Sequence, residues 1–169
     1  MIYLKDKFIL DACCSCRMMW DKENKNHKNA VYIDIRKEPK GFIPSKPNYE
    51  INPDYVMDFR NMDFPDKSFK QVLFDPPHFT QVGHSSIYFK EFGLLGENWE
   101  EDLKKGFDEC WRVLDDYGTL LFKWSDHDIK AERILQIVGR RPTIRNINSG
   151  SGKSKTYWFV FIKIPEVLI

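Results

Sequence analysis

The feature that most constrains the fold is a series of four short apolar runs, each bounded by turn-forming residues and each carrying an aspartate at or near its end. The runs are FILDACC, AVYIDIR, DYVMDF and QVLFDPPH, at about residues 8–14, 30–36, 54–59 and 71–78. Apolar runs of this length between turn signals are typical of buried strands. The four runs therefore predict four strands of one sheet.

The second half of the chain adds two amphipathic segments. The segment at about 98–114 gives the clearest helix, because one helical face carries Trp99, Leu103, Phe107, Cys110, Trp111 and Leu114. The turn DDYG and a strand at about 118–125 follow it, and a second helix is predicted near 128–139.

Two connections and the C-terminal runs complete the pattern. The first two strands are joined by a short predicted helix, whereas residues 37–53 contain four prolines and a glycine and predict an irregular crossover. The apolar runs 143–148 and 156–164 flank the loop 149–155, which predicts an antiparallel hairpin at a sheet edge.

This order of elements predicts one three-layer α/β domain over residues 1–169. Its sheet is expected to be mostly parallel, with the antiparallel hairpin at the C-terminal end. The chain shows no internal repeat and no linker that would divide it.

Charge and cysteine content restrict the class of protein further. The 26 Lys and Arg nearly balance the 25 Asp and Glu, so that a nucleic-acid contact would need a local basic patch. The N-terminus lacks the features of a signal peptide, and no apolar run approaches the ~20 residues that span a bilayer. We therefore expect a cytoplasmic protein without membrane contact, with its four cysteines as free thiols.

The four aspartates are expected to meet at one edge of the sheet. In open α/β sheets, ligands bind outside the carboxyl ends of the strands, and Asp11, Asp34, Asp58 and Asp75 lie at these ends. A single aspartate at a strand end is commonly only a turn former. Four at successive strand ends favour a ligand site.

This pattern resembles the motif series of class I S-adenosylmethionine (SAM)-dependent methyltransferases, over about residues 8–125. The resemblance implies a Rossmann-like fold, with SAM as the cofactor. It implies that Asp11, Ala12, Cys13 and Cys14 surround the methionine part, that Asp34 binds the ribose, and that Asp58 with Phe59 meets the adenine, with Ile35 and Asp75 also among the cofactor-binding residues. A carboxylate can accept both ribose hydroxyls, and an acidic rim suits the sulfonium cation.

The first loop departs from the usual pattern, because residues 11–17 contain no glycine. Small Ala, Ser and Cys side chains stand in its place. The loop is similar to that of a group of small phage and bacterial methyltransferase-like proteins with a Cys-Cys pair and a DPPH motif. That similarity implies that Arg17 and Met18 lie near the methionine end of the cofactor.

The tetrapeptide Asp75-Pro76-Pro77-His78 is similar to the (D/N/S)PP(Y/F/W/H) motif of methyltransferases that modify exocyclic amino groups. The resemblance implies that the Asp75 carboxylate and the Pro76 carbonyl accept hydrogen bonds from the amino protons, that the two prolines hold the loop rigid and extended, and that His78 stacks on the base. The alternatives are an ordinary turn after a strand and a surface histidine without a catalytic role.

The implied reaction is direct methyl transfer to adenine N6, or less readily cytosine N4, in DNA or RNA. No metal is expected, because Cys14 and Cys16 are too close in sequence for the usual zinc spacing. The sequence Gly152-Lys153-Ser154 is not a P-loop, because the earlier glycine of that motif falls on Ile147.

Two further segments are candidates for substrate contacts. Lys153 and Lys155, with Arg140, Arg141 and Arg145, are expected to touch phosphates, the alternative being a solvated hairpin tip. Residues 79–98 are expected to form a substrate lid, although Tyr88, Phe89 and Phe92 could simply cover the core.

Two other functions remain open from the sequence. One is a non-catalytic cofactor-binding or regulatory protein, such as a phage anti-restriction factor. The other is a methyltransferase for small molecules or proteins. Because 169 residues leave no room for a recognition domain, a protein partner is a candidate source of target recognition.

Overall fold

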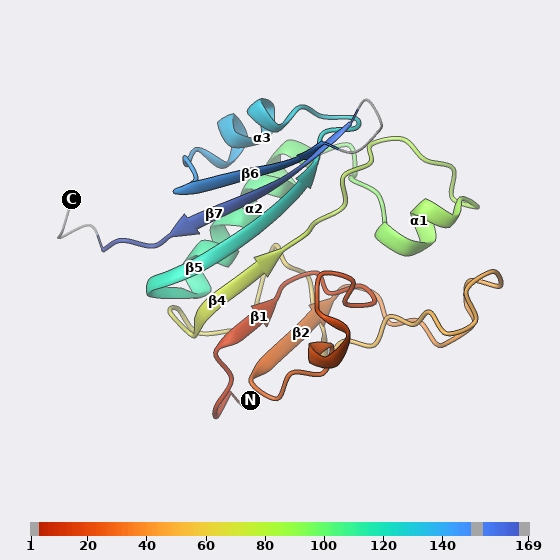
Figure 1. The fold of residues 1–169 in the computed structure, drawn as a ribbon, viewed down its shortest axis with the longest axis horizontal. Helices are drawn as coiled ribbons and strands as arrows, with labels where there is room; N and C mark the ends of the chain where they lie inside the picture. Colours follow the sequence, from red (N-terminus) through yellow and green to blue (C-terminus); the bar gives the residue numbers. More distant parts are fainter. Residues whose placement is uncertain (1–3, 150–153, 166–169) are drawn as a thin grey trace.

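The computed structural model describes residues 4–149 and 154–165, and these residues form one seven-stranded sheet (Figure 1). The strand order is β3-β2-β1-β4-β5-β7-β6. The strands are β1 (Ile9–Asp11), β2 (Ala30–Asp34), β3 (Tyr55–Val56), β4 (Phe69–Phe74), β5 (Leu114–Ser125), β6 (Ile144–Ser149) and β7 (Lys155–Ile162). Strands β1 to β5 pair in parallel, whereas β7 is antiparallel to both β5 and β6. The predicted mostly parallel sheet with an antiparallel C-terminal hairpin is confirmed.

The connections on the β1–β3 side contain little helix. Between β1 and β2 the predicted short helix is only a 3-10 turn, η1 (Lys22–Asn24), whose N-terminus is capped by the Asp21 carboxylate. The crossover between β2 and β3 contains no helix, as its prolines predict. Its two arms are tied by a bridge between Glu38 and Ile51.

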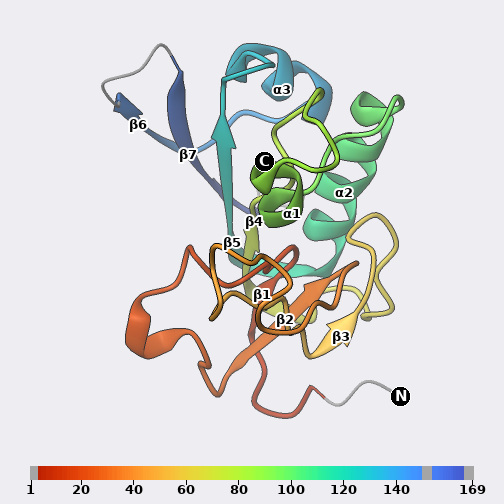
Figure 2. The same cartoon turned by 90° about the vertical axis from the view of Figure 1, so that its right-hand side faces the viewer.

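Two helices cover one face of the sheet (Figure 2). The predicted helix at 98–114 is α2 (Trp99–Val113), which packs on β4 and β5 and buries Leu103, Phe107 and Cys110. The second predicted helix is shorter than expected. Helix α3 (Ala131–Val138) begins only after Lys130, whose backbone is extended, and it ends where Gly139 adopts the left-handed conformation.

A third helix, α1 (Ile87–Phe92), was not expected from the sequence. It has only six residues, too few to show a helical repeat of apolar positions. Ser86 caps it by accepting a hydrogen bond from the Tyr88 amide. Figure 1 shows α1 beyond the carboxyl ends of β4 and β5.

The predicted turn DDYG is wrong, because β5 begins at Leu114, directly after α2. The pairing with β4 jumps from Phe69–Leu114 to Gln71–Thr119, so these residues form a bulge within the strand. Tyr117 takes a positive φ of 60° in this bulge. A side chain at Gly118 would collide with the Asp115 carbonyl, 2.7 Å from the position of its Cβ.

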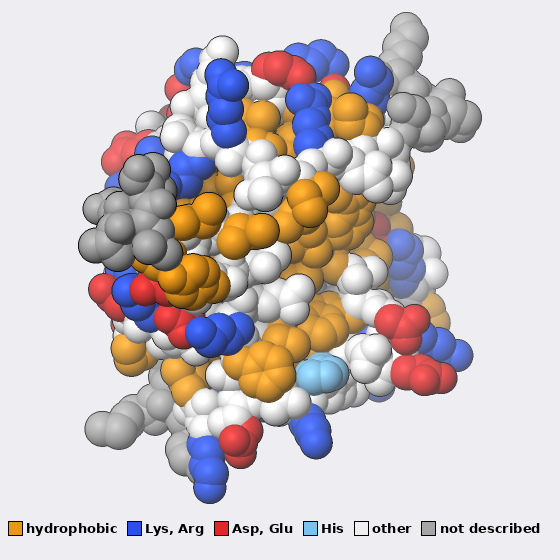
Figure 3. All heavy atoms as spheres, turned by 60° about the vertical axis from the view of Figure 1, so that its left-hand side comes forward, with side chains coloured by type: hydrophobic (Ala, Val, Ile, Leu, Met, Phe, Trp, Pro, Cys, Tyr) orange, Lys and Arg blue, Asp and Glu red, His pale blue; other side chains and the backbone are white. Residues whose placement is uncertain are grey.

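The two faces of the sheet are covered unequally. The main core lies under α2 and α3 and includes Phe74, Phe122, Trp124 and Phe159, all fully buried. On the other face, Leu73 and Leu121 pack in a smaller cluster with Met19 and Trp20, and their cross-strand neighbours Val160 and Ile144 continue the same row. Figure 3 shows hydrophobic side chains gathered on this side. Ile144, at the edge of this row, is 57% exposed.

Among the described residues, no helix has both the length and the apolar character needed to cross a membrane.

Candidate functional site

A cavity of about 480 Å³ lies at the carboxyl ends of the parallel strands. Its walls come from the loop after β1, the ends of β2, β4 and β5, the start of β7 and the segment around α1. The residues that line it are 11–15, Met18, Met19, 34–36, Phe59, 75–79, Phe89, 92–94, Lys123, Ser125 and Thr156. Three of the four predicted acids, Asp11, Asp34 and Asp75, are therefore brought together in one cavity.

The first loop achieves without glycine the backbone shape that glycine usually permits. Ser15 and Arg17 both have positive φ, 43° and 59°. The Ser15 amide donates to Asp34 Oδ2 at 3.0 Å, and the Cys14 amide donates to the Ile33 carbonyl at 2.9 Å. These bonds fix the loop against the end of β2 and offset the cost of the left-handed residues.

Asp11 is buried at the end of β1 with one neutral polar partner. The indole Nε1 of Trp20 donates to its Oδ2 at 2.8 Å. Burial raises the pKa of Asp11 to about 7, and the negative charges of Asp75 and Asp34 add to this rise, whereas the Trp20 hydrogen bond opposes it. Asp11 therefore changes charge near neutral pH.

Asp34 lies at the end of β2 with its side chain 5% exposed. Besides the Ser15 amide, it accepts from the Arg36 amide at 2.9 Å and from the Arg36 guanidinium at 3.1 Å. Arg36 therefore folds back over the position expected to bind ribose hydroxyls. Ile35 lines the same part of the cavity and is 59% exposed.

The structure does not bring Asp58 or Arg17 to the cavity. Both oxygens of Asp58 accept from Arg60, at 3.0 and 2.6 Å. Burial raises the pKa of Asp58, but the hydrogen bonds from Arg60 outweigh it and leave the pKa below its ordinary value. Arg17 turns away, stacks 3.7 Å above the ring of Tyr32 and donates to the Asn52 carbonyl. Phe59, the neighbour of Asp58, does line the cavity.

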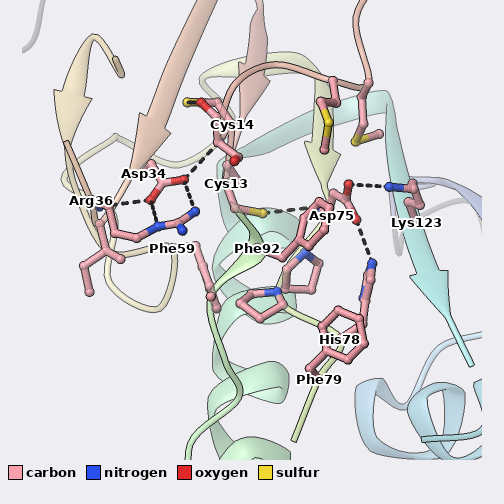
Figure 4. Close-up of a pocket in the computed structure, with 18 of the residues that line it drawn as sticks. Cys13, Cys14, Asp34, Arg36, Phe59, Asp75, His78, Phe79, Phe92 and Lys123 are labelled. Atoms are coloured by element: carbon pink, nitrogen blue, oxygen red, sulfur yellow. Dashed lines mark hydrogen bonds and ion pairs between the residues drawn. The ribbon is translucent and has the colours of Figure 1, made fainter. Parts of the chain in front are cut away.

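Figure 4 shows Asp75 between two nitrogen-bearing side chains at the end of β4. Lys123 Nζ lies 2.7 Å from Asp75 Oδ2, and His78 Nε2 lies 2.9 Å from Asp75 Oδ1. The Asp75 amide donates to Cys13 Sγ at 3.2 Å, which ties the tetrapeptide to the first loop. Lys123, from β5, was not identified from the sequence, although a charged residue inside an apolar strand was a signal for it.

His78 is neither a surface residue nor an open stacking platform. Its side chain is 13% exposed, and its ring stands edge-on to Trp124, with 4.8 Å between the ring centroids. Its Nδ1 is buried and has no hydrogen-bond partner. The aromatic rings that do face the cavity are Phe79, Phe89 and Phe92, from the segment that contains α1.

The α1 segment is fastened to the first loop and to the irregular crossover. The Glu91 carbonyl accepts from Ser15 Oγ at 2.8 Å and from Tyr49 Oη at 3.1 Å. The buried Glu91 carboxylate pairs with Lys46. The predicted lid segment, residues 79–98, therefore closes one side of the cavity. The side chain of Tyr88 in this segment is 53% exposed.

All four cysteines are free thiols, and three of them lie in the first loop. Burial raises the pKa of the Cys13 and Cys14 thiols above the ordinary value, so both stay protonated at neutral pH. Within residues 4–149 and 154–165, no group of three or more His, Cys, Asp or Glu side chains is placed to hold a metal ion.

The basic residues expected to touch phosphates are only partly near the cavity. Lys155 starts β7, next to Thr156 in the cavity wall, whereas Lys153 lies outside the described residues. Arg145 stacks on the Tyr157 ring and pairs with Glu132, and Arg140 stacks on Trp111. These two arginines are therefore already engaged by neighbouring side chains.

Gly106 in α2 provides a test of how the cavity wall at Phe59 is packed. A Cβ at this position would lie 2.5 Å from Phe59 Cε2 and 3.1 Å from Phe74 Cζ. We expect Gly106→Ala to lower the free energy of unfolding by about 1–3 kcal/mol through overpacking, although alanine favours a helix by about 1 kcal/mol. Denaturant unfolding measures this change.

The same variant should displace Phe59 into the cavity and weaken the binding of a ligand there. The matched control is Lys104→Ala, at an exposed position of the same helix. Equal stability of Gly106→Ala and the parent chain would show that Phe59 has free space to move.

No protein-family model and no curated protein sequence matches the chain. Its similarity is to solved structures. A SAM-dependent methyltransferase from Methanosarcina mazei superposes with a TM-score of 0.60 at 13% identity, covering 97% of this chain and 96% of that one. N-methyltransferase NodS from Bradyrhizobium japonicum WM9 gives 0.59 at 13% identity, covering 94% and 86%.

A geranyl diphosphate methyltransferase, solved with geranyl diphosphate and sinefungin, gives a TM-score of 0.58 at 9% identity, covering 94% of this chain and 71% of that one. Together with the strand order, these similarities show that the chain has the Rossmann-like fold of class I SAM-dependent methyltransferases. The fold does not by itself determine the substrate.

Proposed function

We propose that this chain is a SAM-dependent methyltransferase that transfers a methyl group to an exocyclic amino group of a nucleobase, adenine N6 rather than cytosine N4, in DNA or RNA. The observation that carries the proposal is the segment Asp75-Pro76-Pro77 directly after β4, with the Asp75 carboxylate in the same cavity as Asp11 and Asp34.

The cavity fits SAM in its donor set. Asp34 would accept the ribose hydroxyls, Ile35 and Phe59 would flank the adenine, and Asp11 would meet the cationic methionine end. The acids Asp11 and Asp75 also suit a sulfonium cation. SAM, when bound, supplies an electrophilic methyl group. Asp34 can accept the ribose hydroxyls once Arg36 gives up part of its hydrogen bonding to the Asp34 carboxylate.

The chain's own contribution to transfer would be to orient the acceptor amino group and to take the one proton that the nitrogen loses when it is methylated. An aromatic amino nitrogen is a poor nucleophile, because its lone pair is delocalised into the ring. Hydrogen bonds from its protons to the Asp75 carboxylate and to the Pro76 carbonyl would direct the lone pair toward the methyl group. Asp75 lines the cavity with its side chain 20% exposed, which supports this role.

The aromatic wall contributed by the α1 segment would hold the base. Phe79, Phe89 and Phe92 face the cavity, and flat rings of this kind stack on unpaired bases. His78, which is edge-on to Trp124, would instead contact the Asp75 carboxylate. Lys155 and Lys153 are proposed to contact flanking phosphates, and a protein partner is proposed to supply target recognition.

Incubation with SAM labelled in its methyl group tests this function. The acceptor pools are single-stranded DNA, duplex DNA and RNA, with protein and small-molecule extracts in parallel. We expect label in nucleic acid, recovered as N6-methyladenine after digestion. Label in protein or small molecules alone would overturn the nucleic-acid substrate. Binding of S-adenosylhomocysteine without transfer to any pool would favour a non-catalytic protein.

A further inference from the structure

Lys123 reaches the candidate active site from an element outside the DPPH motif. It lies in β5, and its Nζ is 2.7 Å from Asp75 Oδ2. The side chains of Lys123 and Asp75 are only 24% and 20% exposed. Both line the cavity, and Figure 4 shows the ammonium directed at the carboxylate.

The position of Lys123 follows from the alternation of β5. Phe122 and Trp124 are fully buried on the face covered by α2 and α3, so Lys123 between them points to the opposite face. Near the carboxyl end of β5, that face opens into the cavity, where Ser125 also lines the wall. Strand β5 therefore places the ammonium group of Lys123 at the carboxyl end of β4.

The effect of this cation on the pKa of a carboxyl group can be judged within the cavity by comparing Asp75 with Asp11. Asp11 and Asp75 both line it, but the hydrogen-bonding side chain at Asp11 is the neutral Trp20 indole. Burial raises the pKa of Asp11 to about 7. Burial also raises the pKa of Asp75, but His78 and Lys123 outweigh it and hold the pKa below its ordinary value.

The two oxygens of Asp75 are used differently. Oδ2 accepts a hydrogen bond from Lys123. Oδ1 is buried, and His78 Nε2 lies 2.9 Å from it. A carboxylate oxygen has two acceptor sites, so the carboxylate can accept from an incoming donor while Lys123 stays in place.

We infer that Lys123 is a positioning residue, which binds Asp75 Oδ2 and holds the carboxylate ionised and oriented at the cavity wall, where it would accept a hydrogen bond from the acceptor amino group. This inference rests on the proposed function for the identity of the acceptor. The state of Asp75 itself can be measured without any substrate.

The first test is a carboxyl NMR titration of the cofactor-free protein. The groups that face Asp75 are His78 in its own turn, Lys123 from β5, and Asp11 and Cys13 from β1 and the following loop. We expect Asp75 to titrate at a higher pH in Lys123→Met than in the parent chain, and at the parent value in Lys123→Arg. The Asp11 resonance is identified by its loss in Asp11→Asn.

The matched control is Lys70→Met. Lys70 Nζ also lies 2.7 Å from a carboxylate, Asp115 Oδ2, but this pair is outside the cavity. Its removal should leave the titration of Asp75 unchanged. An equal titration of Asp75 in Lys123→Met and the parent chain would overturn the inference, provided that both show a cooperative thermal transition.

The second test is the pH dependence of kcat/KM on the acceptor found above. Asp75 must be ionised to accept amino protons, so activity falls below its pKa, by about tenfold per pH unit. We expect this acid limb to move to higher pH in Lys123→Met and to return in Lys123→Arg. A uniform loss of rate with an unmoved limb would contradict the inference. If no nucleic acid is methylated, the proposed function fails while the titration still decides the role of Lys123.

Discussion

Replacing Asp75 with alanine is expected to lower kcat for methyl transfer by about 10²–10³-fold, which is the usual effect of removing one preorganised group that stabilises a transition state. The Asp75 carboxylate lines the cavity and is the proposed acceptor for the amino protons. Alanine removes this acceptor and leaves the Lys123 ammonium without its partner. Single-turnover transfer of labelled methyl groups measures the change.

Two variants separate this effect from a general loss of structure. Asp75→Asn keeps one acceptor oxygen and should retain part of the rate. Asp63→Ala removes a carboxylate from an exposed loop and should be indistinguishable from the parent chain. A rate for Asp75→Ala within a few-fold of the parent, with S-adenosylhomocysteine still bound, would mean that Asp75 is not the proton acceptor.

Asp11→Asn is expected to raise the free energy of unfolding by about 2–4 kcal/mol above pH 7 in the cofactor-free protein. Because the pKa of Asp11 is about 7 in the folded state and near 3.8 in the unfolded state, the folded chain binds the extra proton between these values. Stability therefore falls as the pH rises through this window. Asparagine carries no such penalty and still accepts the Trp20 hydrogen bond.

The gain in the free energy of unfolding of Asp11→Asn should consequently vanish below about pH 4, where Asp11 of the parent chain is protonated in both the folded and the unfolded state. Urea unfolding at pH 4, 6 and 8 measures the trend, with Asp63→Asn as the exposed control. A difference between the variant and the parent that does not change with pH would contradict the explanation. If the proposed function is right, the more stable variant should also bind S-adenosylhomocysteine more weakly.

The sequence predicted most reliably those features that depend on residues close together in the chain. Apolar runs ending in aspartate predicted both the parallel strands and the meeting of Asp11, Asp34 and Asp75 at one rim. The same pattern was misleading for Asp58, because Arg60, only two residues away, takes both carboxylate oxygens. Arg17 also does not reach the cavity. Its stacking on Tyr32 depends on a positive φ, which the residue type alone does not predict.

The residues that the sequence did not reveal come from distant segments. Lys123 meets Asp75 across 48 positions of the chain, and the pairing depends on the register between β4 and β5. Contacts of this kind follow from topology and side-chain direction, neither of which a periodic pattern specifies.

The attachment of α1 has a kinetic consequence. The Glu91 carbonyl accepts from Ser15, in the loop proposed to surround SAM, and Arg36 donates to the neighbouring Lys90 carbonyl at 3.2 Å. Each bond also holds a residue that lies against Asp34. If the proposed function is right, a movement of α1 that breaks both bonds to admit a base also loosens the cofactor side, and the lifetimes of the two bound molecules are then linked.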